Sequence, residues 1–64
     1  MEIHTRKISK EIYDRAMKNN GTIVFMDAMK LFEDYEATGC NVLSPLVFEK
    51  ENEFYARYIV DKNF

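Results

Sequence analysis

The sequence predicts a small α+β domain with the element order β-α-α-β-β, in which two helices pack on an antiparallel sheet dominated by a C-terminal hairpin. Three observations predict this class. Apolar residues alternate along residues 42–60, they follow helical spacing in two earlier segments, and turn-forming residues separate these segments. A chain of 64 residues has room for one domain, so we assign residues 1–64 to a single unit.

The N-terminal segment predicts a strand followed by a helix. The strand is expected from Ile3 to Ile8. Ser9 follows and is suited to an N-cap, because its hydroxyl can accept a hydrogen bond from the free backbone N–H groups of a first helical turn. Apolar residues then recur at helical spacing, and Asn19-Asn20-Gly21 provides a C-terminal stop. We therefore expect a helix from Ser9 to Asn19.

A second helix is predicted further along the chain. From Ala28 to Tyr35 apolar residues fall at positions i, i+3, i+4 and i+7, with Asp27 as a suitable N-cap and Thr38-Gly39 as the end. Residues 22–25 leave two alternatives open. They are β-branched and follow a glycine, which favours a short strand, but Thr22 could also cap the first turn of the helix.

Residues 42–60 predict a β-hairpin, because apolar and polar side chains alternate along the second half of this segment. If Asn52 adopts the left-handed conformation, Lys50–Asn52 form a three-residue loop. This register pairs Phe48 with Phe54 near the loop and Val42 with Val60 at the other end. Pro45 cannot donate a hydrogen bond to a neighbouring strand, so we expect its strand to lie at the sheet edge or to contain a bulge there.

The predicted hairpin has apolar side chains on both faces, so the sheet needs two covers. One layer of helices supplies the first cover, and a second protein chain is the expected second cover. Tyrosine and arginine are typical anchors of protein interfaces. The predicted oligomer interface on the second face consists of Val47, Tyr55, Arg57 and Ile59.

The small size of the chain also favours association. A domain of this length buries only about 60% of its unfolded surface and usually needs a disulfide, a metal or oligomerisation as reinforcement. Cys40 is the only cysteine and His4 the only histidine, so the chain offers neither an internal disulfide nor a Cys/His metal site. Oligomerisation is therefore the expected reinforcement.

No constellation of catalytic residues is recognisable in the sequence. His4 and Cys40 have no third residue to orient them, and the two glycines are isolated instead of grouped in a phosphate-binding loop. We therefore expect neither enzyme activity nor a cofactor. The start Met1–Lys7 has no apolar signal segment, and no apolar run approaches the roughly 20 residues of a membrane span. These features predict a cytoplasmic protein without a membrane partner.

The basic residues near the N-terminus do not predict a nucleic-acid interface. They are Arg6, Lys7, Lys10, Arg15 and Lys18. On a helix several of them have an acidic residue four positions away, as in the pairs Lys10–Asp14 and Glu11–Arg15. Few aromatic side chains are interleaved with them to stack on bases. Nucleic acid is therefore not the expected partner.

Five acidic residues depart from local rules. Glu33, Asp34 and Glu36 lie near the C-terminal end of the second predicted helix, where the helix dipole disfavours negative charge. Glu49 would face Glu53 across the hairpin, and like charges opposite each other destabilise a sheet. These residues are candidate contacts to a basic protein surface. The alternative is a solvated face that protects a sheet edge and disfavours aggregation.

In size and style the chain resembles the small single-domain accessory proteins that phages and other mobile elements carry. Many of those proteins inhibit a host protein, and anti-defence inhibitors are among them. The resemblance implies a non-enzymatic module that occupies a surface of a host protein. The alternative from the residues themselves is an oligomer that holds a nucleotide or another small molecule between subunits, with Arg57 and either Tyr55 or Tyr58 supplying charge and stacking.

Overall fold

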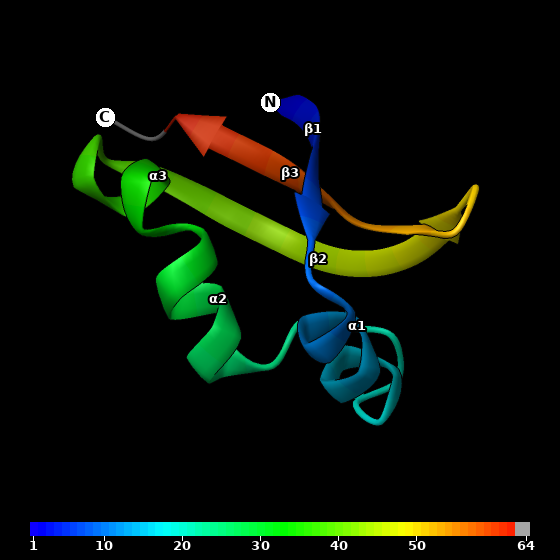
Figure 1. Ribbon diagram of the computed structural model, residues 1–64. Coiled ribbons are helices and arrows are strands. Elements are labelled where there is room, and N and C mark those ends of the chain that lie inside the picture. Colours follow the sequence, from blue (N-terminus) through cyan, green and yellow to red (C-terminus); the bar gives the residue numbers. More distant parts are fainter. Residues whose placement is uncertain (63–64) are drawn as a thin grey trace.

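The computed structural model describes residues 1–62 and confirms the predicted α+β class and element order (Figure 1). The elements are β1 (Glu2–Ile8), α1 (Lys10–Met17), α2 (Phe25–Leu31), α3 (Glu33–Ala37), β2 (Cys40–Lys50) and β3 (Glu53–Lys62). The strands form one antiparallel sheet in the order β1-β3-β2, so the last strand of the sequence is central. None of the helices in this part of the chain is long and apolar enough to cross a membrane.

The first helix begins after Ser9, as predicted, and ends at Met17, two residues before the predicted end at Asn19. The Ser9 hydroxyl accepts a hydrogen bond from the backbone N–H of Ile12 at 3.3 Å, as an N-cap does. After α1, Asn20 and Gly21 have φ angles of 58° and 80°, and the Gly21 N–H donates to the carbonyl of Ala16. Both residue types tolerate the left-handed conformation, so they reverse the chain without strain.

Residues 22–24 form neither a full strand nor a helical turn. Thr22 makes an isolated antiparallel bridge with Leu46 of β2. The helix then begins at Phe25, with Val24 in the N-cap position and no side-chain cap. Asp27 is not the predicted cap, because it lies in the first turn of α2 and binds Arg15 instead.

The second predicted helix is divided in two at Phe32, which has a φ of −110°. At this break Arg6 of β1 donates a hydrogen bond to the carbonyl oxygen of Leu31. The Tyr35 N–H bonds the carbonyl of Phe32 instead, at 3.1 Å. An arginine side chain therefore takes an acceptor that a continuous helix would have used, and α3 starts as a separate short helix.

The hairpin exists, but its loop and register differ from the prediction. The loop has two residues, Glu51 and Asn52, both with positive φ, so Phe48 pairs with Tyr55 and not with Phe54. A bulge between Leu43 and Leu46 shifts the register by one residue. The shorter loop and the bulge shift the pairing by one residue in opposite directions. The ends of the segment therefore pair as predicted, with Val42 opposite Val60. The edge position of β2 and the bulge beside Pro45 are both confirmed.

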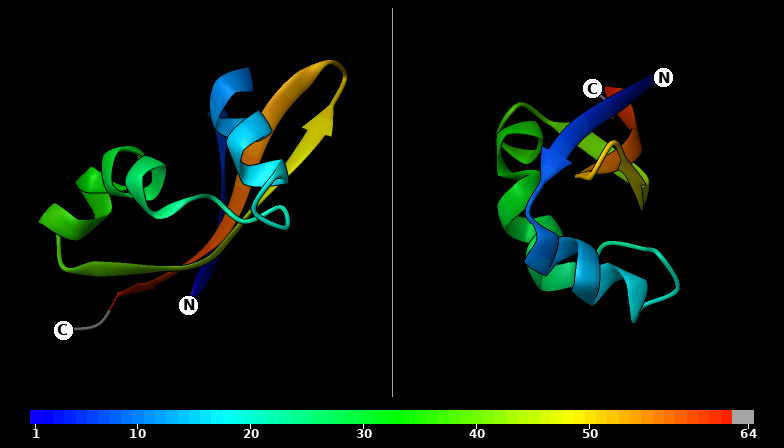
Figure 2. Two further views of the ribbon diagram at one scale, coloured as in Figure 1. Left: turned by 90° about the horizontal axis from the view of Figure 1, so that it is seen from below. Right: turned by 45° about the vertical axis from the view of Figure 1, so that its right-hand side comes forward.

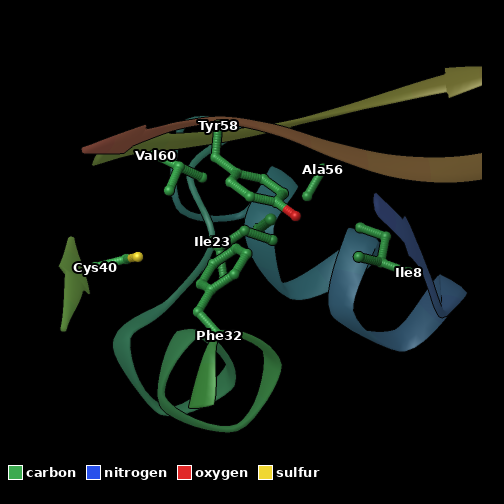
Figure 3. Close-up of a cluster of buried hydrophobic side chains, with 8 residues drawn as sticks. Ile8, Ile23, Phe32, Cys40, Ala56, Tyr58 and Val60 are labelled. Carbon is green, nitrogen blue, oxygen red and sulfur yellow. The ribbon is translucent and has the colours of Figure 1, made fainter. Parts of the chain in front are cut away.

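All three helices cover one face of the sheet. In Figures 1 and 2 the helices gather on one side of the strands. Ala56, Tyr58 and Val60 point from β3 toward this layer, where they meet Phe32 and Ile23 (Figure 3). Every one of these five side chains is buried. The alternate residues of β3 must therefore point to the other face of the sheet.

Candidate functional site

The face of the sheet opposite the helices is the candidate site, and we call it the outer face. Strand alternation and register assign to it Ile3, Thr5 and Lys7 of β1, Leu43, Leu46, Phe48 and Lys50 of β2, and Glu53, Tyr55, Arg57 and Ile59 of β3. No element within residues 1–62 packs over this face. Ile3 is 63% exposed and Leu46 is 50% exposed.

The outer face has an apolar end and a polar end. The register places Ile3, Ile59 and Leu43 side by side across the three strands. At the opposite end the Lys7 ammonium binds the Glu53 carboxylate at 2.9 Å, and the Tyr55 hydroxyl donates to the same carboxylate. These hydrogen bonds lower the pKa of Glu53. Protein interfaces bury apolar side chains and keep polar groups at their margin, so the apolar end is the part of this face suited to contact.

A shallow hollow lies in the middle of the outer face. It has a volume of about 260 Å³ and is lined by Ile3, Leu46, Ile59, Arg57, Ser44 and Tyr58. Ser44 has a φ of 50° within the bulge of β2. Among the described residues Arg57 forms no ion pair. Its guanidinium is therefore available to an anionic group on a molecule that covers this face.

Three of the four predicted interface residues lie together on the outer face: Tyr55, Arg57 and Ile59. Val47 was placed on the wrong face, because the two-residue loop puts it opposite the inward-pointing Ala56. The same correction brings Leu46 and Phe48 to the outer face, and Ile3 joins them from β1. Pro45 indicated the bulge in the sequence. No residue pattern indicated the two-residue loop that sets the final register.

The inner side of the sheet carries a chain of hydrogen-bonded polar groups. The Tyr58 hydroxyl lies 3.1 Å from that of Tyr35, which lies 3.0 Å from Nδ1 of His4. The other ring nitrogen of His4 contacts the Glu2 carboxylate at 2.9 Å. Burial, followed by the hydrogen bond with Tyr35, raises the pKa of Tyr58 to about 12. These groups face the helix layer and join α3 to the sheet.

The five acidic candidates do not form one surface. Glu33, Asp34 and Glu36 belong to α3, whereas Glu49 and Glu53 flank the hairpin loop at the other end of the molecule (Figures 1 and 2). The expected repulsion between Glu49 and Glu53 is absent, because Glu49 pairs with Phe54 and Glu53 pairs with Lys50. The longer predicted loop caused this error.

Some of these acidic groups are already bound within the molecule. Asp34 accepts two hydrogen bonds from Arg6, at 3.0 and 3.3 Å, and this contact lowers its pKa. Glu53 binds Lys7, as described above. Glu33, Glu36 and Glu49 are exposed and form no ion pair within residues 1–62. Of the five acidic candidates, these three have their charge available to a partner in the described part of the chain.

A second exposed apolar surface lies on α2. Phe25 is 77% exposed, Met26 is 73% exposed and Met29 is 53% exposed. The hydrophobic periodicity of the sequence identified the buried side of this helix but gave no signal for these residues. Methionine side chains adapt to irregular apolar partners, so this surface suits contact with another protein.

Comparison of the chain with protein-family models, with curated proteins and with solved structures finds no match.

Proposed function

We propose that this chain is a cytoplasmic, non-enzymatic protein-binding module that pairs with a second copy of itself and acts by occupying a surface of a host protein. The observation that supports the proposal best is the outer face. Large apolar side chains of all three strands lie there without a covering layer in the described part of the chain. A one-layer helix–sheet domain leaves such a face for a partner.

A second copy fits the outer face because the apolar end can pair with itself. Two sheets that overlap at Ile3, Leu43 and Ile59 bury these side chains in one central patch, as the two sheets of a β-sandwich do. The polar end with Lys7, Glu53 and Tyr55 then lies at the rim, where ion pairs stay hydrated. Pairing also gives so small a domain the additional buried area that it needs.

The α2 surface is the proposed contact to the host protein. It lies on the helix layer, on the opposite side of the sheet from the outer face, so dimerisation leaves it accessible. Its exposed residues Phe25, Met26 and Met29 supply adaptable apolar contact area. The resemblance in size and style to small phage accessory proteins agrees with inhibition by surface occupation.

A nucleotide or another small anionic molecule between subunits is the second candidate. The hollow beside Arg57 supports it, because this guanidinium could bind a phosphate or a carboxylate. Tyr58 cannot stack on such a ligand, since its side chain points into the helix layer and only 2% of the residue is exposed. Tyr55 stays the available aromatic residue, although its ring already stacks on Phe48 with centroids 5.4 Å apart.

Matched lysine substitutions test the proposed dimer. Leu46→Lys places a charge in the outer face, and Met26→Lys places the same charge on an exposed apolar position of α2. We expect light scattering to show dissociation of the Leu46→Lys variant and an unchanged assembly for Met26→Lys. Equal masses for both variants and the parent would reject the outer face as the dimer interface.

A thermal-shift panel of nucleotides and metabolites separates the two candidate functions. A ligand that binds only the folded protein raises the melting temperature by mass action. The protein-binding proposal predicts no rise with any member of the panel. A rise that is lost in the Arg57→Gln variant would support the small-molecule alternative.

A further inference from the structure

A groove runs between the helices and the first residues of β2. It has a volume of about 290 Å³, with Phe25, Ala28, Met29, Phe32 and Glu36 on the helix side and Cys40, Asn41, Val42 and Leu43 on the strand side. Successive residues of a strand point to opposite faces of a sheet. Because four consecutive residues of β2 line the groove, it follows the edge of this strand and does not lie over one face.

The edge of β2 beside the groove is open. As an outer strand of the sheet, β2 presents half of its backbone N–H and C=O groups away from β3. Within residues 1–62, segment 21–23 binds this edge only further along, where Ile23 donates to the Pro45 carbonyl and Val47 donates to the Gly21 carbonyl, both at 2.9 Å. In the described part of the chain, the outward backbone groups of residues 40–43 have no such neighbour.

The groove has an apolar wall and an acidic rim. Phe32 and Cys40 are buried at its base, while Phe25, Met29 and Leu43 are exposed beside it. Glu36 is the one charged residue that lines it. Glu33 lies one helical turn away, and neither carboxylate forms an ion pair in the described part of the chain.

We propose that this groove binds an extended segment of a partner protein, which adds as a strand to the open edge of β2. The backbone of the segment pairs with residues 40–43, continuing the edge that the bridge at Thr22 already uses in part. Alternate side chains of the segment are apolar and pack between Met29 and Val42, since side chains of a strand alternate. A flanking lysine or arginine binds Glu36, because that carboxylate offers the complementary charge. The inference deepens the proposed protein-binding function, but it does not require the dimer.

Selection from a random peptide library displayed on yeast tests the groove. We expect the enriched peptides to share alternating apolar positions and at least one lysine or arginine. Synthetic copies should bind about tenfold more weakly to Met29→Asp and to Glu36→Lys, the loss that a central interface side chain typically causes. Glu11→Lys is the matched control for charge reversal, because Glu11 is an exposed acid on α1. It should leave the peptide affinity unchanged.

Backbone exchange distinguishes strand addition from contact through side chains alone. Bound peptide should slow hydrogen exchange of backbone amides within residues 40–43, because strand pairing removes them from water. The proposal fails if no peptide is enriched, if Met29→Asp and Glu36→Lys bind the peptides as tightly as the parent, or if the slowed amides lie elsewhere.

The same peptides separate this inference from the dimer proposal. Leu46→Lys alters the outer face and lies outside the groove lining. This variant should keep the peptide affinity even where it dissociates the dimer. Loss of peptide binding in Leu46→Lys, with the fold intact, would contradict an independent groove. A monomeric parent that binds the peptides would contradict the dimer alone.

Discussion

The Tyr35 hydroxyl lies 3.1 Å from the Tyr58 hydroxyl and ties the short helix α3 to the central strand β3. Tyr35 also lies beneath the Arg6 guanidinium, whose carbon is 5.0 Å from the ring centroid. His4 supplies the next hydrogen bond in the chain. β1, α3 and β3 are distant in the sequence but meet at the phenol group of Tyr35, which is half-buried on the inner side of the sheet.

Removing the Tyr58 hydroxyl should destabilise the fold. Tyr58→Phe takes away one partner of Tyr35, and we expect a loss of about 1 kcal/mol in the free energy of unfolding, the usual net value of one hydrogen bond. Urea denaturation measures the difference. Tyr13→Phe is the matched control, because the Tyr13 hydroxyl forms no hydrogen bond within residues 1–62. An equal loss of unfolding free energy in both variants would show that the Tyr35–Tyr58 hydrogen bond contributes no specific stabilisation.

The raised pKa of Tyr58 predicts that the folded protein loses stability in alkali. This pKa is raised from the ordinary value of 10.0 to about 12. Between these two pH values the unfolded chain loses the phenol proton and the folded chain keeps it, so stability is complete below the lower value and falls as pH rises toward the upper one. Melting temperatures of the parent should fall across this range more steeply than those of Tyr58→Phe. Parallel curves would contradict this pKa.

The ion pair between Arg15 and Asp27 predicts acid sensitivity. Arg15 donates two hydrogen bonds to Asp27, at 2.8 and 2.9 Å, and they lower the pKa of this carboxyl below its ordinary value of 3.8. The stabilisation is present above that value and is lost as pH falls through the lowered pKa of the folded state. Asp27→Asn should cost no more than about 1 kcal/mol at neutral pH, because Arg15 is half exposed. Its melting temperature should decline less below pH 4 than that of the parent.

The hairpin loop offers a stabilising substitution. Glu51 and Asn52 have φ angles of 52° and 64°, and such a two-residue turn favours Asn-Gly. Glu51→Asn combined with Asn52→Gly should raise the free energy of unfolding by about 1 kcal/mol, since the left-handed conformation is costly for most residues. Glu51→Ala removes the charge but retains the strain, so it should give no gain. A gain from Glu51→Ala alone would assign the effect to charge.

The sequence predicted those features of the fold that depend on neighbouring residues. Ser9 and the Asn20-Gly21 pair act within one helical turn, and Pro45 limits its own strand. The alternation along β3 was clear because this strand is central and one of its faces is buried against the helices. Each of these signals is local, so each could be recognised without knowledge of the fold.

The features that were wrong depend on distant contacts or on an unfavourable conformation. The helix break at Phe32 coincides with a hydrogen bond that Arg6 donates to the carbonyl of Leu31, 25 residues away in the sequence. The register after the loop depends on Glu51 in a left-handed conformation, which glutamate rarely adopts. Val47 was assigned to the outer face because this register was misjudged. Ile3 was missed because its place beside Ile59 is a pairing between the two ends of the chain.

Light scattering of the unmodified protein at micromolar concentration tests the central claim most directly, which is that a second copy covers the outer face. We predict a mass of at least twice that of one chain, with slowed hydrogen exchange at outer-face residues in the assembled state. A mass of one chain across the whole concentration range would contradict the claim.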